Sequence, residues 1–360
     1  MGPKSNIVQS IASKVGRNLH RQDDHPLQII KTWINQYFLD KYKAKDGSCM
    51  FTTFDDLSPI VTKAMCFDDL LTPEDHPSRS RQDTYYVDDD RLLRSHMTAH
   101  QTTLMREGHR QSVLFLPPAL EADASPRAFL CTGDVYRRDA IDSCHYPCFH
   151  QMDGVRIFSW EELGVDCHEK AEEIVLSDLK NALAGMIEVV FGKVEMKWTE
   201  SYFPFTHPSL ELEIFFNGKW LEERRSRETR PTADRWSRWA FGLGLERLAM
   251  ILFQIPDIRL FWSTDKRFTS QFQGVLSSGR KNVVFAPFSK YPICYKDVSL
   301  WHPPVMHDND VMEIIREVVG DSAEDVEVID AFVHPKTGRS SKCYRISYRS
   351  MERTLTNVSA

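Results

Sequence analysis

The segment from residue 133 to residue 154, GDVYRRDAIDSCHYPCFHQMDG, constrains the fold of this chain more than any other stretch. It crowds charged and hydrogen-bonding side chains around the aromatic Phe149 and contains few helix-favouring residues. That density of polar groups predicts a hairpin that lines a cleft. Its chemically active side chains are Arg137, Arg138, Asp139, Asp142, His145, His150, Gln151 and Asp153.

The composition is that of an ordinary globular protein. The chain has 360 residues, of which 42% are hydrophobic and 27% charged, enough for about two or three domains. These values exclude a disordered chain, a collagen-like fibre and a disulfide-stapled miniprotein. Because no run approaches the roughly 20 apolar residues of a spanning helix, we expect no membrane association. The net charge of −6 requires any nucleic-acid binding to come from local basic patches.

Hydrophobic periodicity predicts three helices, over residues 25–42, 168–191 and 245–253. The residues of the first helix expected to face a core are Leu27, Ile30, Ile34 and Phe38. Those of the second are Ile174, Leu179, Leu183 and Ile187. Strand-like runs such as residues 211–216 lie between the second helix and the third, so the chain mixes both kinds of element.

The two ends of the chain carry basic, amphipathic patterns. Near the start, apolar residues recur every four positions beside a basic face, at Ile7, Ile11, Val15 and Leu19. This predicts an amphipathic helix, typical either of a mitochondrial transit peptide or of an ordinary surface helix. Near the end, buried and basic positions alternate with period two, which predicts a half-buried strand. Its apolar residues are Tyr344, Ile346 and Tyr348, and its basic ones are Arg345 and Arg349.

An arginine interrupts the third predicted helix. Arg247 follows the glycines of FGLGLER, residues 241–247, but the pattern lacks the sixth-position glycine and the βαβ setting of a dinucleotide site. Among apolar neighbours an arginine is costly unless it is paired. Arg247 therefore either bridges an acid, extends its head to solvent, or faces a phosphate. A zinc site in residues 144–150 is not expected, because the spacing of Cys144, His145, Cys148 and His150 fits no standard pattern.

Three segments taken together resemble a known family. HPSR at 76–79, VYRRDAIDSCHYPCFHQ at 135–151 and FGLGLERLAM at 241–250 resemble motifs 1, 2 and 3 of class II aminoacyl-tRNA synthetases, in the same order. YFPFTHP at 202–208 is similar to the phenylalanyl-tRNA synthetases. The last seventy or so residues, including SKYPICYKDVSLW from residue 289, resemble the anticodon-binding domain of the monomeric mitochondrial form.

The resemblance implies an α+β fold in two parts. An antiparallel class II sheet flanked by helices should precede a ferredoxin-like anticodon-binding domain that is truncated, without its last helix and strand. We expect an N-terminal extension and helix over 1–45, the catalytic domain over 46–265, a linker over 266–284 and the anticodon-binding domain over 285–360.

The implied activity is phenylalanine–tRNA ligation in the mitochondrial matrix, with ATP and Mg²⁺, by a monomer that binds tRNA(Phe). Three departures from the family pattern, of which the truncated C-terminal domain is one, leave open an alternative, a catalytically impaired relative that binds only tRNA or substrate. Residues 223–238 replace a glycine-rich stretch with a run of six arginines and no glycine, and residues 112–126 look inserted before motif 2. A ligase of the biotin or lipoate type fits less well, because the FPF triplet and the C-terminal domain argue against it.

The resemblance also implies residue roles. For ATP, Arg137 should bind the α-phosphate and Arg247 the γ-phosphate side, as the two catalytic residues. Asp139 should face the adenine amine, Phe149 should stack on the ring, and His145 should lie nearby. For phenylalanine, the implied residues are His96, Thr98, His100, Gln101, Gln151, Asp153, Phe203, Phe205, Glu222, Ala240 and Gly242. Glu213 is the candidate Mg²⁺ ligand, and Lys342, Arg345 and Arg349 are candidates for tRNA binding.

Overall fold

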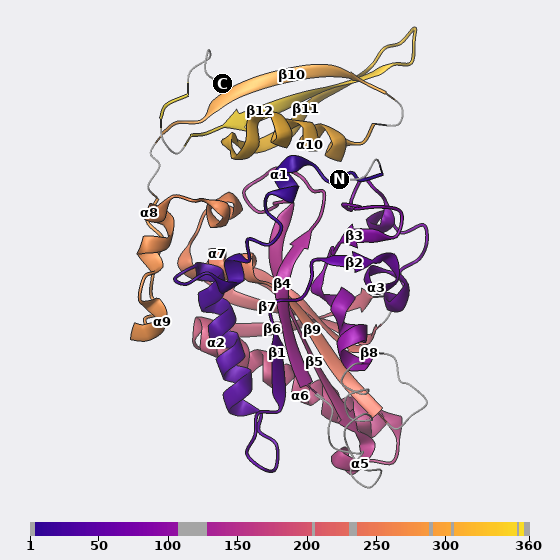
Figure 1. Ribbon diagram of the computed structural model, residues 1–360, viewed down its shortest axis with the longest axis vertical. Helices are drawn as coiled ribbons and strands as arrows, with labels where there is room; N and C mark the ends of the chain where they lie inside the picture. The colour runs from indigo at the N-terminus through magenta and orange to yellow at the C-terminus, as the bar shows by residue number, and fades with distance from the viewer. Residues whose placement is uncertain are drawn as a thin grey trace.

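The computed structural model describes residues 4–106, 128–203, 206–229, 236–287, 291–303, 306–350 and 353–355. A larger unit is built around a seven-stranded sheet, and a smaller unit with a three-stranded sheet lies against one end of it (Figure 1). No helix within these ranges is both long and apolar enough to cross a membrane.

The large sheet is almost wholly antiparallel. Its strand order is β1-β4-β5-β9-β8-β7-β6, and only the edge pair β1–β4 is parallel. The strands are β1 (Phe51–Phe54), β4 (Ala128–Tyr136), β5 (Cys148–Ser159), β6 (Glu195–Phe203), β7 (Thr206–Phe216), β8 (Lys219–Thr229) and β9 (Trp236–Gly244). A separate ribbon pairs β2 (Ile60–Thr62) with β3 (Arg91–Leu93). The run predicted as a strand at 211–216 lies in β7.

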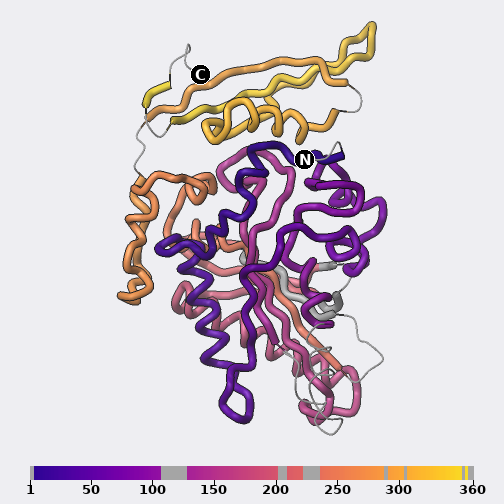
Figure 2. Tube along the Cα trace, in the orientation of Figure 1, coloured from indigo at the N-terminus to yellow at the C-terminus, as the bar shows by residue number. Residues whose placement is uncertain are grey.

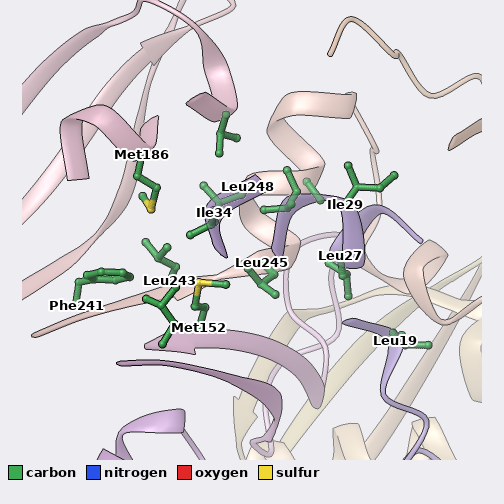
Figure 3. Packing of buried hydrophobic residues seen from close by; sticks show 14 of the residues in the cluster. Leu19, Leu27, Ile29, Ile34, Met152, Met186, Phe241, Leu243, Leu245 and Leu248 are labelled. Atoms are coloured by element: carbon green, nitrogen blue, oxygen red, sulfur yellow. The ribbon is translucent and has the colours of Figure 1, made fainter. Parts of the chain in front are cut away.

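Three helices pack on one face of this sheet and form the main core with it. They are α2 (Pro26–Lys41), α6 (His168–Phe191) and α7 (Leu245–Phe253), so all three predicted helices are confirmed. In Figure 3, Ile34 of α2, Met186 of α6 and Leu248 of α7 approach Met152 and Leu243 of the sheet. The shorter helices are α1 (Gln9–Ala12), α3 (Lys63–Cys66), α5 (Trp160–Leu163), α8 (Lys266–Thr269) and α9 (Val275–Ser278).

The predicted core faces of the two long helices are correct with one exception. The four apolar residues chosen in α2 are all fully buried. In α6 the buried stripe runs through Val175, Leu179, Leu183 and Ile187, whereas Ile174 is 40% exposed. Successive residues of an α-helix are turned by about 100°, so a shift of one position moves Ile174 off the buried face.

The single helix predicted near the N-terminus is wrong, although its apolar stripe is buried. Only α1 and a 3₁₀ turn at Leu19–Arg21 form, because Gly16 and Asn18 have positive φ angles of 81° and 48° that end any helix. Ile11 and Leu19 nevertheless lie in the main core. The segment is therefore packed into the fold.

The segment predicted as a linker, residues 266–284, holds α8 and α9. Its side chains Phe268, Phe272 and Val275 are fully buried in the main core. This part of the chain therefore packs with the larger unit before the smaller unit begins.

The smaller unit is a three-stranded antiparallel sheet with one helix. Its elements are β10 (Cys294–His302), α10 (Asp308–Val319), β11 (Ala323–Val333) and β12 (Ser340–Tyr348), and the strand order is β10-β12-β11. The period-two pattern of β12 is confirmed, since Tyr344, Ile346 and Tyr348 are buried. Helix α10 lies between this sheet and the larger unit (Figure 1).

The two units meet at the connection between β4 and β5, residues 137–147. Ile141 of this connection is buried among Val311, Ile315 and Val326 of the smaller unit, and its carbonyl accepts a hydrogen bond from the Val326 amide at 3.1 Å. Figure 2 shows the N-terminal trace, including α1, running along the same junction. The core of the smaller unit thus includes a residue from the larger one.

Polar contacts reinforce this junction. Arg316 of α10 donates to the carbonyl oxygens of Asp139 and Ala140. Arg138 lies 3.0 Å from Asp310. Further contacts include hydrogen bonds from the hydroxyl of Tyr85 to Glu313 and from that of Tyr146 to Asp321, each 2.7 Å long.

Candidate active site

Alternate residues of β5 face opposite sides of the large sheet, and the predicted site residues share one side. Phe149, Gln151 and Asp153 lie on the face opposite Met152, which belongs to the main core. Asp153 is 3% exposed and accepts hydrogen bonds from the Thr98 hydroxyl and the Gln101 amide, both at 2.8 Å. The amide of Met97 donates to Gln151 at 3.3 Å. The structure therefore brings four of the residues predicted for phenylalanine into one cluster.

Strand β9 closes this cluster. Its residues Gly242 and Ala240 are paired with Asp153 and Val155 of β5, and Ala240 is buried. A Cβ atom on Gly242 would lie 2.9 Å from the Asp153 carboxylate, closer than side chains normally approach. The absence of a side chain on Gly242 thus leaves room for the Asp153 carboxylate.

The two histidines of the same segment have different neighbours. The Nε2 atom of His96 lies 3.8 Å from the Cys66 sulfur. His100 is buried and accepts from the guanidinium of Arg94 at 2.9 Å. Burial, together with Arg94, lowers the pKa of His100 to about 4, so the ring is neutral near pH 7. His100 therefore contacts Arg94, away from the Asp153 cluster predicted for the substrate ammonium.

Arg94 is a structural centre that the sequence analysis missed. Its guanidinium pairs with Asp134 of β4 at 2.6 Å, and both side chains are at most 3% exposed. Burial pushes the pKa of Asp134 upward, but Arg94 and the Tyr136 hydroxyl hold it below its ordinary value. The pair fixes the segment that carries Thr98 and Gln101 to the sheet. The sequence feature that could have indicated this ion pair is the position of Arg94, directly after the short strand β3.

The residues predicted for ATP lie in two places, on the sheet near Phe149 and in the connection between β4 and β5. Arg137 donates to the Ser95 carbonyl at 2.8 Å, and its guanidinium lies over the Phe149 ring, 5.2 Å from the centroid. Asp139 lies in the β4–β5 connection, where its carboxylate accepts from the Ala140 amide at 2.9 Å. His145 pairs with Asp142 at 2.6 Å within the same turn, and 54% of its side chain is exposed. Arg137 and Phe149 thus contact each other directly, whereas Asp139 and His145 contact residues of the β4–β5 connection.

Arg247 has one of the settings that its sequence context left open, because its head extends to solvent. The apolar residues of α7 face the core, whereas Arg247 is exposed in the first turn. The amphipathic helix turns this position to solvent, so the arginine leaves no unpaired charge in the core. Among the residues that the structure describes, Arg247 has no ion-pair partner, so the bridging alternative is not realised there either. An exposed guanidinium at this position can take an external anion.

A buried residue next to Arg247, Glu246, was also missed. Glu246, 2% exposed, accepts from the main-chain amide of His150 at 2.8 Å and from its ring Nδ1 at 2.7 Å. No residue pattern announces such a pair, although Glu246 directly precedes the predicted Arg247.

Some predicted residues lie outside the described part of the chain. These are Phe205 and residues 112–126, together with the side chains of Phe203 and Glu222. Of residues 223–238, the backbone through Thr229 continues β8 and pairs with β7 and β9, and residues 230–235 are not described.

The predicted magnesium ligand Glu213 stands beside a cation. Its carboxylate lies 3.5 Å from the Lys197 ammonium across the β6–β7 pair. Within the described ranges, no three His, Cys, Asp or Glu side chains gather closely enough to hold a metal ion. The described side chains around Glu213 therefore form no metal site, and the side chain of Glu222, which is paired with Glu213 across β7 and β8, lies outside them.

The three cations predicted to bind tRNA are each paired with an acid. The pairs are Lys342 with Asp308, Arg345 with Asp297 and Arg349 with Glu324, at 2.7, 2.8 and 3.1 Å. The charge of the basic strand face is thus partly neutralised within the smaller unit. Arg349 also lines a cavity of about 430 Å³ between the two units, which none of the residues predicted for ATP or phenylalanine lines.

Comparison with known families agrees with this geometry. The description "tRNA synthetases class II core domain (F)" matches residues 14–272, and "Ferredoxin-fold anticodon binding domain" matches residues 289–360. An antiparallel sheet with one parallel edge pair and three covering helices, over the residues that the family description matches, defines a class II aminoacyl-tRNA synthetase.

Curated relatives narrow the class. The chloroplastic/mitochondrial phenylalanine–tRNA ligase of Arabidopsis thaliana is 49% identical, over 99% of this chain and 78% of that protein. The mitochondrial phenylalanine–tRNA ligase of Mus musculus is 45% identical, over 98% of this chain and 80% of its own length. That of Saccharomyces cerevisiae is 35% identical, over 98% and 87%. The chain belongs to the organellar phenylalanine–tRNA ligase family, as its motifs predicted.

Proposed function

We propose that this chain attaches phenylalanine to tRNA(Phe) at the expense of ATP, in the mitochondrial matrix and as a monomer. One observation carries the proposal: Phe149, Gln151 and Asp153 share one face of β5, with Arg137 over Phe149 and with Thr98 and Gln101 on Asp153. A nucleotide-binding group and an amino-acid-binding group thus lie side by side on one strand. This is the arrangement needed to bring a carboxylate to an α-phosphate.

The reaction needs positioning and charge stabilisation rather than a covalent enzyme intermediate. A carboxylate oxygen of phenylalanine attacks the α-phosphorus of ATP, and the bond to the β-phosphate oxygen breaks to release pyrophosphate. A ribose hydroxyl of the terminal adenosine then attacks the carbonyl carbon, and AMP leaves with the bonding electron pair. Arg137 and Arg247 are assigned to the phosphate charges, which suits their planar, permanently charged heads.

The amino acid is assigned to the Asp153 cluster. Carboxylate and amide oxygens of Asp153 and Gln151 can accept from the substrate ammonium, and their own hydrogen bonds hold them in place before it arrives. Phe203 and Phe205 are assigned to the substrate ring. Edge-to-face contacts of that kind contribute about 0.5–1.5 kcal/mol each beyond burial.

Class II synthetases generally use ATP with a divalent metal. Because the described side chains around Glu213 form no metal site, we assign Mg²⁺ to the nucleotide substrate and derive no step through it. The smaller unit is assigned to the anticodon region of the tRNA, with Lys342, Arg345 and Arg349 as candidate contacts. Their acidic partners would have to be exchanged for phosphates on binding.

Phenylalanine-dependent ATP–pyrophosphate exchange tests the proposal. We expect exchange by the wild-type chain, and Arg247→Ala should raise the KM for ATP by about 10–100-fold, the typical loss of one charged phosphate contact. The melting temperature should stay unchanged because Arg247 is exposed. Arg280→Ala, at another exposed arginine, is the matched control. Binding of ATP and tRNA without exchange would instead identify the chain as a catalytically impaired relative.

A further inference from the structure

We propose that Glu246 is a positioning residue that holds the nucleotide-binding groups of β5 and α7 in register. The proposal rests on the proposed function, since it takes Phe149 and Arg247 to contact ATP. It concerns a buried carboxylate behind the sheet, away from the face on which the substrates are assigned.

Glu246 lies at the end of the β5–β9 strand pair. Strands β5 and β9 pair from Ser159 opposite Trp236 to Gln151 opposite Gly244, where β9 ends and the chain turns into α7. The next residue of β5 beyond this pairing is His150. Its amide donates to the Glu246 carboxylate at 2.8 Å. The carboxylate of Glu246 thus accepts the hydrogen bond of the first β5 amide beyond the end of the pairing with β9.

The contact between Glu246 and His150, called the link below, is buried and has two hydrogen bonds. The same carboxylate accepts from the His150 ring at 2.7 Å, and the exposed fractions of Glu246 and His150 are 2% and 0%. The ring is also held by Trp262 and His20, with centroids 5.7 and 5.2 Å away. Hydrogen bonds to a buried charge are stronger than those between neutral groups, and losing one leaves an unpaired buried charge. Glu246 therefore fixes α7 to β5 at one point.

The link joins the positions next to Phe149 and Arg247. Phe149 precedes His150 in β5, and Arg247 follows Glu246 in α7, so each nucleotide-binding residue is adjacent to one partner of the link. Asp153 is held separately, by Thr98, Gln101 and its pairing opposite Gly242. A change in the link should therefore disturb ATP binding and spare the amino-acid site.

Two variants weaken the link from its two ends. Glu246→Asp keeps the charge but is one methylene too short to reach both donors. His150→Phe keeps a ring and removes the ring donor. Glu246→Gln is the conservative rescue, because its oxygen can accept from the main-chain amide while its NH₂ donates to Nδ1 once the ring proton moves to Nε2.

Steady-state exchange kinetics with ATP and phenylalanine varied in turn test the proposal. For Glu246→Asp we expect the KM for ATP to rise about tenfold, the scale of a sub-ångström displacement, and the KM for phenylalanine to change less than about twofold. His150→Phe should shift the KM for ATP in the same direction, and Glu246→Gln should behave as wild type.

A purely structural role predicts a different result. In that case a folded variant would lose kcat, or both KM values would change together, and either result for Glu246→Asp or His150→Phe would overturn the proposal. Failure of the proposed function is separate, because then the wild-type chain itself shows no exchange. If one variant does not fold, the other decides.

Discussion

At the scale of single residues, the site depends on close approaches between groups that hold each other in place. Asp153 is surrounded by two donors and by the main chain of Gly242, so its carboxylate has little freedom to move. Such preorganisation costs nothing at the moment of reaction, because the groups are already oriented.

Gly242→Ala should disturb this carboxylate selectively. The new Cβ would lie 2.9 Å from a carboxylate oxygen of Asp153, so the side chain must turn away from Thr98 and Gln101. We expect the KM for phenylalanine to rise about tenfold or more, as misplacement of a positioning group does. The KM for ATP in the same exchange assay serves as the internal control. An unchanged KM for phenylalanine would show that Asp153 does not orient the substrate.

Sequence motifs predicted which residues belong to the site but not why several of them are there. Gln151 and Asp153 follow from the resemblance, whereas the close approach of Gly242 to the Asp153 carboxylate and the choice among the settings of Arg247 come only from the structure. Arg94 and Glu246 were missed, because a buried ion pair or carboxylate forms only when distant segments meet. Their partners Asp134 and His150 lie in other strands, beyond the reach of any local pattern.

At the scale of elements, buried neutral histidines hold the first long helix. The amide of Leu27 donates to Nδ1 of His25, so Nε2 carries the proton that His25 donates to the Phe261 carbonyl at 3.0 Å. Burial lowers the pKa of His25 to about 4. Burial and the neighbouring His150 lower the pKa of His20 to about 3. A proton on Nδ1 of His25 would abolish the helix cap.

These shifts predict acid sensitivity below neutral pH. The unfolded chain takes up protons as the pH falls through about 6.5, whereas folded His25 stays neutral until about 4, so stability decreases across that window. Between pH 7.5 and 5 each such histidine should cost about 2 kcal/mol of the free energy of unfolding. His25→Asn keeps a capping acceptor and should remove its share, measured by denaturant unfolding at both pH values. Equal losses in variant and wild type would refute this assignment.

Local periodicity predicted the long helices because each buries one regular stripe. It failed near the N-terminus, where the stripe is real but Gly16 and Asn18 bend the chain. It failed at Ile174 because a sequence shows that a helix has an apolar face without fixing the edges of that face.

At the scale of the whole molecule, the two units are joined through residues 137–147. The order of the motifs along the chain predicted two successive units. It did not predict that the smaller unit packs on the connection between β4 and β5. That contact joins residues far apart in the chain and has no signature in either segment. It places Asp139, assigned to adenine, directly under α10.

Arg316→Ala should loosen the junction. Arg316 is 9% exposed and bridges α10 to two carbonyls of the connection, so its loss leaves those acceptors unpaired. We expect the radius of gyration measured by small-angle X-ray scattering to increase. The control is Arg339→Ala. The Arg339 guanidinium lies over the Trp301 ring within the smaller unit, so this substitution should leave the radius of gyration unchanged. An identical radius for Arg316→Ala and wild type would contradict the prediction.

The burial of Ile141 in the smaller unit also bears on modularity. The boundary between the two matched families falls between residues 272 and 289, yet the apolar interior around α10 is completed by a side chain from the other side of that boundary. A fragment cut at the boundary would expose Val326 and Ile315 to water. Inherited or engineered changes in the connection between β4 and β5 should therefore appear first as heat sensitivity of the smaller unit.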